Sequence, residues 1–298
     1  MGGTISPSQP CFKTRVNDRR NIWAPCPALN GVFFLLQFLN HCWRWLATAI
    51  SFAAFGLGAL LMGALILPIA VVASFTQWGK SAKVQRALRR QVGHLCQLFA
   101  WLMRTLGVLD YQISGYEQRD VKGPLLILAN HPSLIDVIFL LAMYPESQCV
   151  VKRALWVNPF THLMMRSADY ISNADPELLL ARCVESLQRG NTLILFPEGT
   201  RTGPGGPLDF KAGAATIAVR ADCDILPVLI NVSPTTLTKS DPWYSVPSRQ
   251  VMMRLSVKPM LRVDAELLRD LGPRMASRSF NKHLETWFGD ALMAEYRA

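Results

Sequence analysis

The sequence predicts an α/β fold: a mainly parallel sheet flanked by helices, with an N-terminal hydrophobic membrane helix or helical hairpin. Short apolar runs that are typical of buried strands alternate with helical patterns between about residues 107 and 258. Two of these runs end in polar clusters, which is where ligands bind along the carboxyl edge of an α/β sheet. A stretch without any charged residue extends from Trp45 to Gly79 and is long enough to cross a bilayer.

The composition narrows the classes of function. Half of the 298 residues are hydrophobic, 17% are charged, and the formal net charge is +10. A basic balance suits anionic lipid surfaces, anionic substrates or nucleic acid. The apolar segment favours lipid and substrate, and we expect no nucleic-acid partner because zinc-finger and RNA-binding signatures are absent. The seven cysteines are scattered without a Cys-x-x-Cys pair, so the sequence predicts neither a disulfide framework nor a metal site, and we expect reduced thiols.

We expect three regions along the chain. Residues 1–30 are polar and rich in proline and basic residues, which predicts a disordered arm. Residues 31–79 form a membrane-embedded helical segment, either a single tilted span or a pair of helices that enters and leaves the same leaflet. Basic residues on both flanks, Arg44 before and Lys80 after, make the same-side pair credible, and the positive-inside rule places the following flank in the cytoplasm. Residues 80–298 form the α/β domain.

The domain begins with an amphipathic pattern over residues 84–106, a helix that either packs on the domain or lies at the lipid headgroups. A buried strand over residues 125–129 then runs into the first polar cluster, Asn130-His131-Pro132-Ser133-Leu134-Ile135-Asp136. Pro132 and Ser133 indicate a helix start, which places Asp136 in the first turn. A step of this length can bring imidazole and carboxylate together, and a histidine oriented by an aspartate can act as a general base toward a hydroxyl. A purely structural histidine is the alternative.

The second cluster, Phe196-Pro197-Glu198-Gly199-Thr200-Arg201, follows the apolar run over residues 192–196. From these residues alone, a mutual salt bridge between Glu198 and Arg201 at a strand end is the favoured explanation. The other elements that the patterns predict are a strand at 148–151 that ends at Lys152, a short helix led by Pro159-Phe160, a helix at 176–188 capped by Asp175, a helix at 212–220, a strand at 225–232, a polar loop at 233–248 that is a lid or a membrane edge, a strand at 250–257, and helices at 264–271 and 277–296.

The two clusters resemble the glycerolipid acyltransferase family, which includes the 1-acyl-glycerol-3-phosphate acyltransferases. His-x4-Asp followed by Phe-Pro-Glu-Gly-Thr-Arg carries the resemblance. Lys152 with Pro159-Phe160 is similar to the second block of the family, and Leu226-Pro227-Val228 is similar to the fourth. The resemblance covers about residues 83–260. Pro132 departs from many phosphatidate-forming members, which leaves a lyso-ornithine lipid or another specialised acceptor open.

The resemblance implies roles for individual residues. His131 is the general base and Asp136 holds its ring, with direct attack by the substrate hydroxyl and no acyl-enzyme. Arg201 and Lys152 bind an anionic group of the acceptor, and Glu198 either orients Arg201 or binds an acceptor hydroxyl. Gly199 and Thr200 shape the turn, with backbone N–H groups available to a phosphate.

The function implied is transfer of a fatty acyl group to the free hydroxyl of a lysophospholipid. The default acceptor is 1-acyl-glycerol-3-phosphate, and the donor is a thioester of coenzyme A or acyl carrier protein, with no cofactor and no metal. Related enzymes are monotopic, so the resemblance favours the same-side helical pair. We expect a bacterial inner membrane with the domain on its cytoplasmic side. A catalytically silent membrane scaffold is the competing hypothesis.

Overall fold

The computed structural model describes residues 27–75, 81–115, 123–158, 161–203, 206, 208–242 and 244–297. Two compact units are present, Met1–Cys42 and Trp43–Ala298. In the first unit the described residues form the beginning of helix α1 (Pro27–Phe75), and the second unit contains all other elements. The arm expected over residues 1–30 lies outside the described residues up to position 26, and its last four positions already belong to α1.

The second unit is organised around a seven-stranded sheet with the strand order β1-β7-β6-β2-β5-β3-β4. Among the strands of the described residues, β6 and β7 are the one antiparallel pair and all other neighbours are parallel, so the predicted mainly parallel sheet is confirmed. The strands are β1 (Leu109–Ser114), β2 (Leu125–Ala129), β3 (Gln148–Val151), β4 (Ile171–Ser172), β5 (Thr192–Leu195), β6 (Asp224–Ser233) and β7 (Val251–Val257). The patterns in the sequence do not indicate β1 or the two-residue β4.

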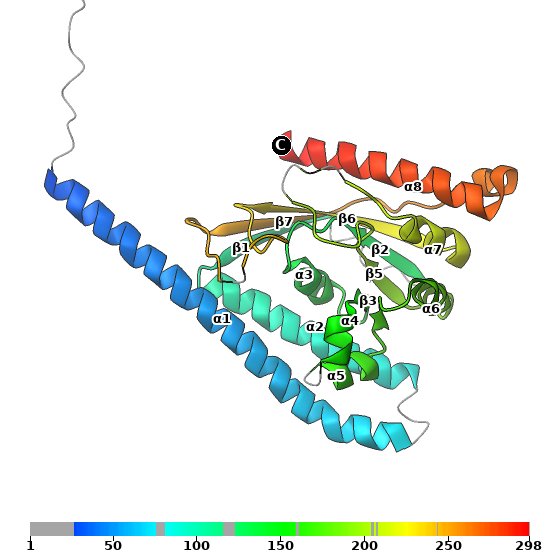
Figure 1. The fold of residues 1–298 in the computed structure, drawn as a ribbon, viewed down its shortest axis with the longest axis horizontal. Coiled ribbons are helices and arrows are strands. Elements are labelled where there is room, and N and C mark those ends of the chain that lie inside the picture. Colours follow the sequence, from blue (N-terminus) through cyan, green and yellow to red (C-terminus); the bar gives the residue numbers. More distant parts are fainter. Residues whose placement is uncertain are drawn as a thin grey trace, which may run out of the picture. The chain divides into compact units, whose positions relative to one another are not determined.

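Helices cover both faces of this sheet (Figure 1). They are α2 (Ala82–Thr105), α3 (Asp136–Met143), α4 (Arg153–Val157), α5 (His162–Ser167), α6 (Pro176–Gln188), α7 (Gly213–Ala221) and α8 (Ala265–Arg297). Along β2, Leu125 and Ile127 pack into the core formed with α2 and α3, whereas Leu126 and Leu128 pack into the core formed with α6, α7 and α8. Both faces of β2 are therefore buried, which is why its sequence is uniformly apolar.

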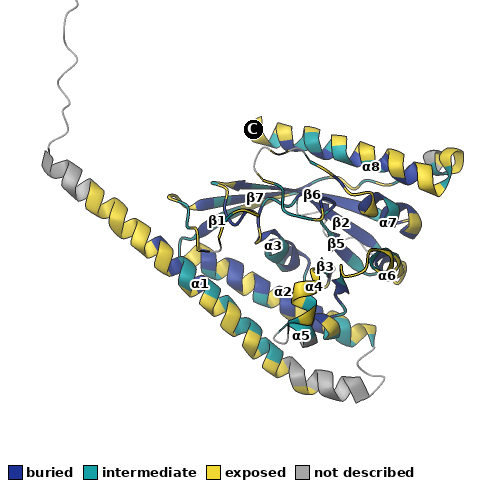
Figure 2. Cartoon of the chain, in the orientation of Figure 1, coloured by how far each residue is buried: buried dark blue, intermediate teal, exposed yellow. Residues whose placement is uncertain are grey.

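Helix α1 is continuous, so the structure does not contain the helical pair considered for residues 31–79. The uncharged stretch offers no polar turn at which two helices could reverse, and Pro68 lies inside the helix. Within the second unit, one stripe of α1 faces the domain: Ala47 and Ser51 are buried, and Phe52, Phe55 and Met62 pack on the core. Over residues 43–65 the remaining faces are exposed or partly exposed and mostly apolar (Figure 2).

Helix α2 confirms the amphipathic pattern and packs on the domain. Its buried residues recur at helical spacing, and Leu98 and Trp101 stay exposed on the outer face. Gly93 lets α2 approach the end of α3, because a Cβ atom there would lie 2.3 Å from Cβ of Pro145. This packing fixes the position of α3, which carries one of the predicted site residues.

One predicted helix boundary is wrong, and the others are confirmed. Helix α3 begins at Asp136 instead of at Pro132-Ser133, because the Ser133 hydroxyl donates to the Thr236 carbonyl at 2.9 Å and so caps no helix. The short helix led by Pro159-Phe160 corresponds to α5, which begins at His162, and the two leading residues lie outside the described part. The two predicted C-terminal helices are confirmed within α8, where Gly272 has non-helical backbone angles and separates them at a kink. The cap at Asp175 is confirmed, since its carboxylate accepts the N–H groups of Glu177 and Leu178.

Candidate active site

The site begins where β2 ends, and Asn130 ties this end to the neighbouring strand. Its side-chain amide donates to the Ile230 carbonyl at 2.8 Å, and its side-chain oxygen accepts the Ile230 N–H at 2.7 Å. These two bonds replace ladder bonds that the strand can no longer make. The backbone of the next residue, His131, is therefore held at a defined height above the sheet.

His131 and Asp136 form the pair that the spacing predicts. Nδ1 of His131 lies 3.0 Å from Oδ2 of Asp136, and the same oxygen accepts the Ser133 N–H at 2.7 Å. Asp136 is fully buried. Burial raises the pKa of its carboxyl to about 6, although the hydrogen bond to His131 and the nearby positive charges lower it. A carboxylate on Nδ1 selects the tautomer with its proton there, which leaves Nε2 as the acceptor for a substrate proton.

The second cluster holds His131 from the other side. The Glu198 carboxylate accepts the His131 N–H at 2.9 Å, and the Thr202 N–H donates to the His131 carbonyl at 3.1 Å. The Phe196 ring stacks on the imidazole with the ring centroids 4.1 Å apart. The two polar clusters therefore meet around a single histidine, as the positions of β2 and β5 in the sheet require.

Glu198 is a buried carboxylate with one unpartnered oxygen. Only 3% of the residue is exposed, and Oε2 has no hydrogen-bond partner among the described residues. Burial raises the pKa of the Glu198 carboxyl to about 7, which the His131 N–H opposes and the Asp136 charge reinforces. It therefore orients the histidine backbone, and the structure shows no bond by which it orients Arg201.

Arg201 holds a loop through two backbone carbonyls. Its Nη1 donates to the carbonyls of Leu237 and Thr238 at 2.7 and 2.8 Å, so the salt bridge with Glu198 considered from the sequence is not formed among the described residues. Its positive charge also lowers the pKa of the Asp136 carboxyl. Anion binding by Arg201 stays a prediction, because the residue lines neither of the two cavities that meet at His131.

Two cavities share His131 as part of their walls. One, of about 590 Å³, is lined by Asn130, Glu198 and Thr202 together with residues of α8. The other, of about 410 Å³, is mostly apolar and runs between α3, α6 and α7. Polar and glycine residues at this second cavity include Lys152, Gly199, Thr200 and Lys211. His131 therefore lies in the wall between two cavities.

The structure brings most of the predicted binding residues to the apolar cavity. Lys152 stands at the N-terminus of α4, and no ion pair of its ammonium is found in the described part of the chain. Gly199 adopts a positive φ of 68°, which a residue with a side chain reaches only with strain. Sequence reasoning missed Lys211, whose ammonium pairs with Asp209, because no local pattern distinguishes it from an ordinary loop lysine.

Several known proteins are similar to this chain. The model of a family described as Acyltransferase matches residues 110–231. The 1-acyl-sn-glycerol-3-phosphate acyltransferase of Helicobacter pylori is 32% identical over 194 residues, which cover 62% of this chain and 77% of that protein. The chain belongs to this acyltransferase family.

Other relatives of the acyltransferase extend the comparison. The 1-acyl-sn-glycerol-3-phosphate acyltransferase of Pseudomonas aeruginosa is 27% identical over 207 residues, covering 67% of this chain and 76% of that protein. A Caenorhabditis elegans protein described as a putative acyltransferase of the same kind is 36% identical over 127 residues, and the match spans 45% of its length. The crystal structure of the 1-acyl-sn-glycerophosphate acyltransferase of Thermotoga maritima has the same fold, with a TM-score of 0.50, 22% identity and coverage of 77% of this chain and 97% of that one.

Proposed function

We propose that this acyltransferase moves a fatty acyl group from a thioester donor to the free hydroxyl of 1-acyl-glycerol-3-phosphate, which gives phosphatidate. The observation that carries the proposal is the position of His131, oriented by Asp136, in the shared wall of two cavities. The bacterial relatives, named as 1-acyl-sn-glycerol-3-phosphate acyltransferases, support this acceptor.

His131 acts as the general base in this proposal. Nε2 takes the proton of the acceptor hydroxyl while the hydroxyl oxygen attacks the thioester carbonyl. The new C–O ester bond forms, the C–S bond breaks, and the imidazolium returns its proton to the leaving thiolate. The Asp136 carboxylate stabilises the imidazolium between these steps. A base of this kind contributes typically about 10²- to 10⁴-fold in rate.

The apolar cavity suits the acceptor, which has a single acyl chain and a phosphate. Its aliphatic walls match the chain, and Lys152 and Lys211 provide positive charge for the phosphate. The second cavity suits the donor, because Thr202, Glu285 and Thr286 offer hydrogen-bond partners to the amide-rich arm shared by coenzyme A and acyl carrier protein. This division places the hydroxyl and the thioester on opposite sides of His131.

We also propose that the enzyme lies on one face of a membrane. The segment Phe34–Leu65 of α1 has a mean hydropathy of 1.9 and is the only helix in the described part that is long and apolar enough to cross a bilayer. However, α1 packs on the domain from Ala47 to Met62, about four turns of helix. A helix held along a polar domain over this length fits a position in the plane of the membrane surface better than a crossing. We place it on the cytoplasmic face of a bacterial inner membrane, because basic residues, Lys80 among them, follow the apolar segment.

The test is acyl transfer by the detergent-purified enzyme, with labelled acyl-CoA and acyl carrier protein thioester offered against several lysolipids. The panel contains 1-acyl-glycerol-3-phosphate, 1-acyl-glycerol without the phosphate, and a lyso-ornithine lipid. We expect phosphatidate as the product, and a loss of at least about 10²-fold in kcat for His131→Ala. Lys152→Met should raise the KM for the acceptor by about tenfold and leave the KM for the donor unchanged, because one charge-assisted contact to the phosphate is removed.

Three other outcomes of this assay would each contradict a different part of the proposal. A product from the lyso-ornithine lipid alone would replace the acceptor and agree with the unusual Pro132. Near-normal turnover by His131→Ala would remove the base from the mechanism. No product from any donor and acceptor pair would contradict the proposed reaction and favour the silent scaffold.

A further inference from the structure

Arg44 is a buried cation on the otherwise uncharged face of α1. Only 5% of the residue is exposed, and its Nε atom is buried without a hydrogen-bond partner. No ion pair or hydrogen bond of Arg44 is found within the described ranges. Burying a guanidinium without a partner is costly, so such a residue in a membrane-facing helix points to a ligand.

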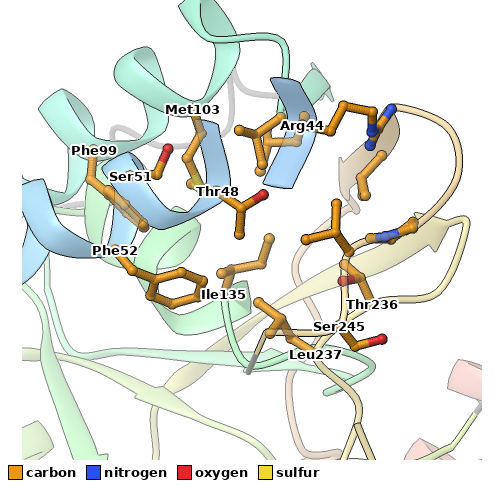
Figure 3. A pocket seen from close by; sticks show the side chains of 15 residues that line it. Arg44, Thr48, Ser51, Phe52, Phe99, Met103, Ile135, Thr236, Leu237 and Ser245 are labelled. Carbon is orange, nitrogen blue, oxygen red and sulfur yellow. The ribbon is translucent and has the colours of Figure 1, made fainter. Parts of the chain in front are cut away.

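The surroundings of Arg44 form a crevice between α1, α2 and the loop that follows β6. Its walls include Thr48 and Phe52 of α1, Phe99 of α2, and Thr236 and Ser245 of the loop. In Figure 3 the Arg44 side chain extends toward the loop, and the two phenylalanine rings lie at the opposite end. Arg44 is the only charged residue among those that line this crevice, so no carboxylate of the described chain neutralises it there.

Exposed aromatic side chains mark the depth of Arg44 relative to a membrane. Trp43 and Trp45, its neighbours in the sequence, are 49% and 55% exposed, and Tyr244 on the adjoining loop is 57% exposed. Tryptophan and tyrosine concentrate at the level of lipid headgroups. In the membrane position proposed above, on which this inference rests, an arginine between two such residues lies at the level of lipid phosphates.

We propose that this crevice binds the phosphodiester of a membrane glycerophospholipid, with the Arg44 guanidinium as its main ligand and the Thr48 and Ser245 hydroxyls beside it. The enclosed space is only about 40 Å³, so the headgroup sits at its mouth and no acyl chain enters. The guanidinium fork matches two phosphate oxygens, which a point charge does less well. This site is separate from the two cavities at His131 and does not depend on which acceptor the enzyme uses.

Removal of a partnered arginine usually lowers the Tm, and we expect the opposite for Arg44 in the absence of lipid. In neutral detergent without lipid, Arg44 is a buried charge that lacks its counter-ion, so Arg44→Met should keep or raise the Tm of the full-length protein. With phospholipid present, the wild-type protein gains binding free energy that the variant cannot gain. A merely structural arginine would instead lower the Tm on substitution under both conditions.

The experiment follows the Tm of the full chain in dodecyl maltoside micelles as phosphatidylglycerol is added. At about ten times the dissociation constant we expect a rise of about 4 °C for the wild type. Arg44→Met should weaken the apparent affinity at least about tenfold and reduce the rise to about 1 °C. Arg44→Lys, which keeps the charge and the fold but not the fork, should give an intermediate rise. The matched control is Arg86→Met, which removes an exposed arginine of α2 and should keep the full rise.

Two further additions identify the ligand chemistry. Diacylglycerol has the chains without the phosphate, and inorganic phosphate has the charge without the chains; neither should raise the Tm. An equal rise with diacylglycerol, or an equal rise for Arg44→Met, would overturn the site. An Arg44-dependent rise with inorganic phosphate as large as that with phosphatidylglycerol would overturn its assignment to lipid. A Tm that falls in Arg44→Met without lipid as much as with lipid would show a structural arginine.

Discussion

Glu198→Gln should make the enzyme more stable in alkaline solution. Gln keeps an oxygen that can accept the His131 N–H, so the substitution removes the ionisation and little else. The ordinary pKa of a glutamate is 4.5, and burial raises that of Glu198 to about 7. The folded protein therefore binds this proton more tightly than the unfolded chain does, so wild-type stability falls as the pH rises from 4.5 through 7.

The size of the effect follows from these two pKa values. Each pKa unit corresponds to about 1.4 kcal/mol, so the full effect is on the order of 3 kcal/mol, and most of it develops between about pH 5 and pH 8. For a domain of this size, each kcal/mol moves the Tm by about 2–4 °C. Relative to wild type, we expect the Tm of Glu198→Gln to gain roughly 5–10 °C between these pH values.

Thermal unfolding of both proteins in one detergent, at half-unit steps of pH, measures this difference. The matched control is Glu285→Gln. Glu285 is partly exposed and lines the same cavity as Glu198, and its carboxylate also accepts a backbone N–H, that of Phe210. We expect the pH-dependent gain in Glu198→Gln. A constant Tm difference between Glu198→Gln and wild type across this range would refute the argument that Glu198 is forced to ionise inside the protein.

Two predictions concern the catalytic pair and the loop. Wild-type kcat should fall as the pH drops through about 6, where the Asp136 carboxylate is protonated, which gives the pH–rate profile an acid limb. Asp136→Asn should lose about 10²- to 10⁴-fold in kcat and should also lose this acid limb. An unchanged acid limb in the variant would assign it to another group. Arg201→Met should raise the apparent pKa of that limb, because a positive charge near Asp136 is lost, and should speed hydrogen exchange in the loop around Thr238. An increase in the acceptor KM of tenfold or more with no change in the limb or in exchange would instead support direct anion binding by Arg201.

Features that depend on residues close together in the chain could be predicted from the sequence. Buried strands are recognised because both faces of a parallel sheet are covered, and the Asp175 cap is recognised because its partners are the next few N–H groups. The pairing of His131 with Asp136 belongs to the same class, since only five positions separate them. The boundary of α3 was misplaced because the Ser133 hydroxyl bonds to Thr236, a residue 103 positions away.

The sequence by itself determined where two polar clusters follow buried strands and that a long apolar helix is present, and it indicated the candidate side chains of the site. Only the tertiary structure decided what those side chains contact. Glu198 supports His131 across 67 positions, Arg201 fastens a loop instead of pairing with Glu198, and Lys211 joins Lys152 at one cavity. The physical reason is that these partners are brought together by the order of strands in the sheet, and hydrogen bonds between distant segments leave no periodic trace in the chain. Arg44 belongs to the same class, because its burial arises where α1 meets a loop some 200 residues further along.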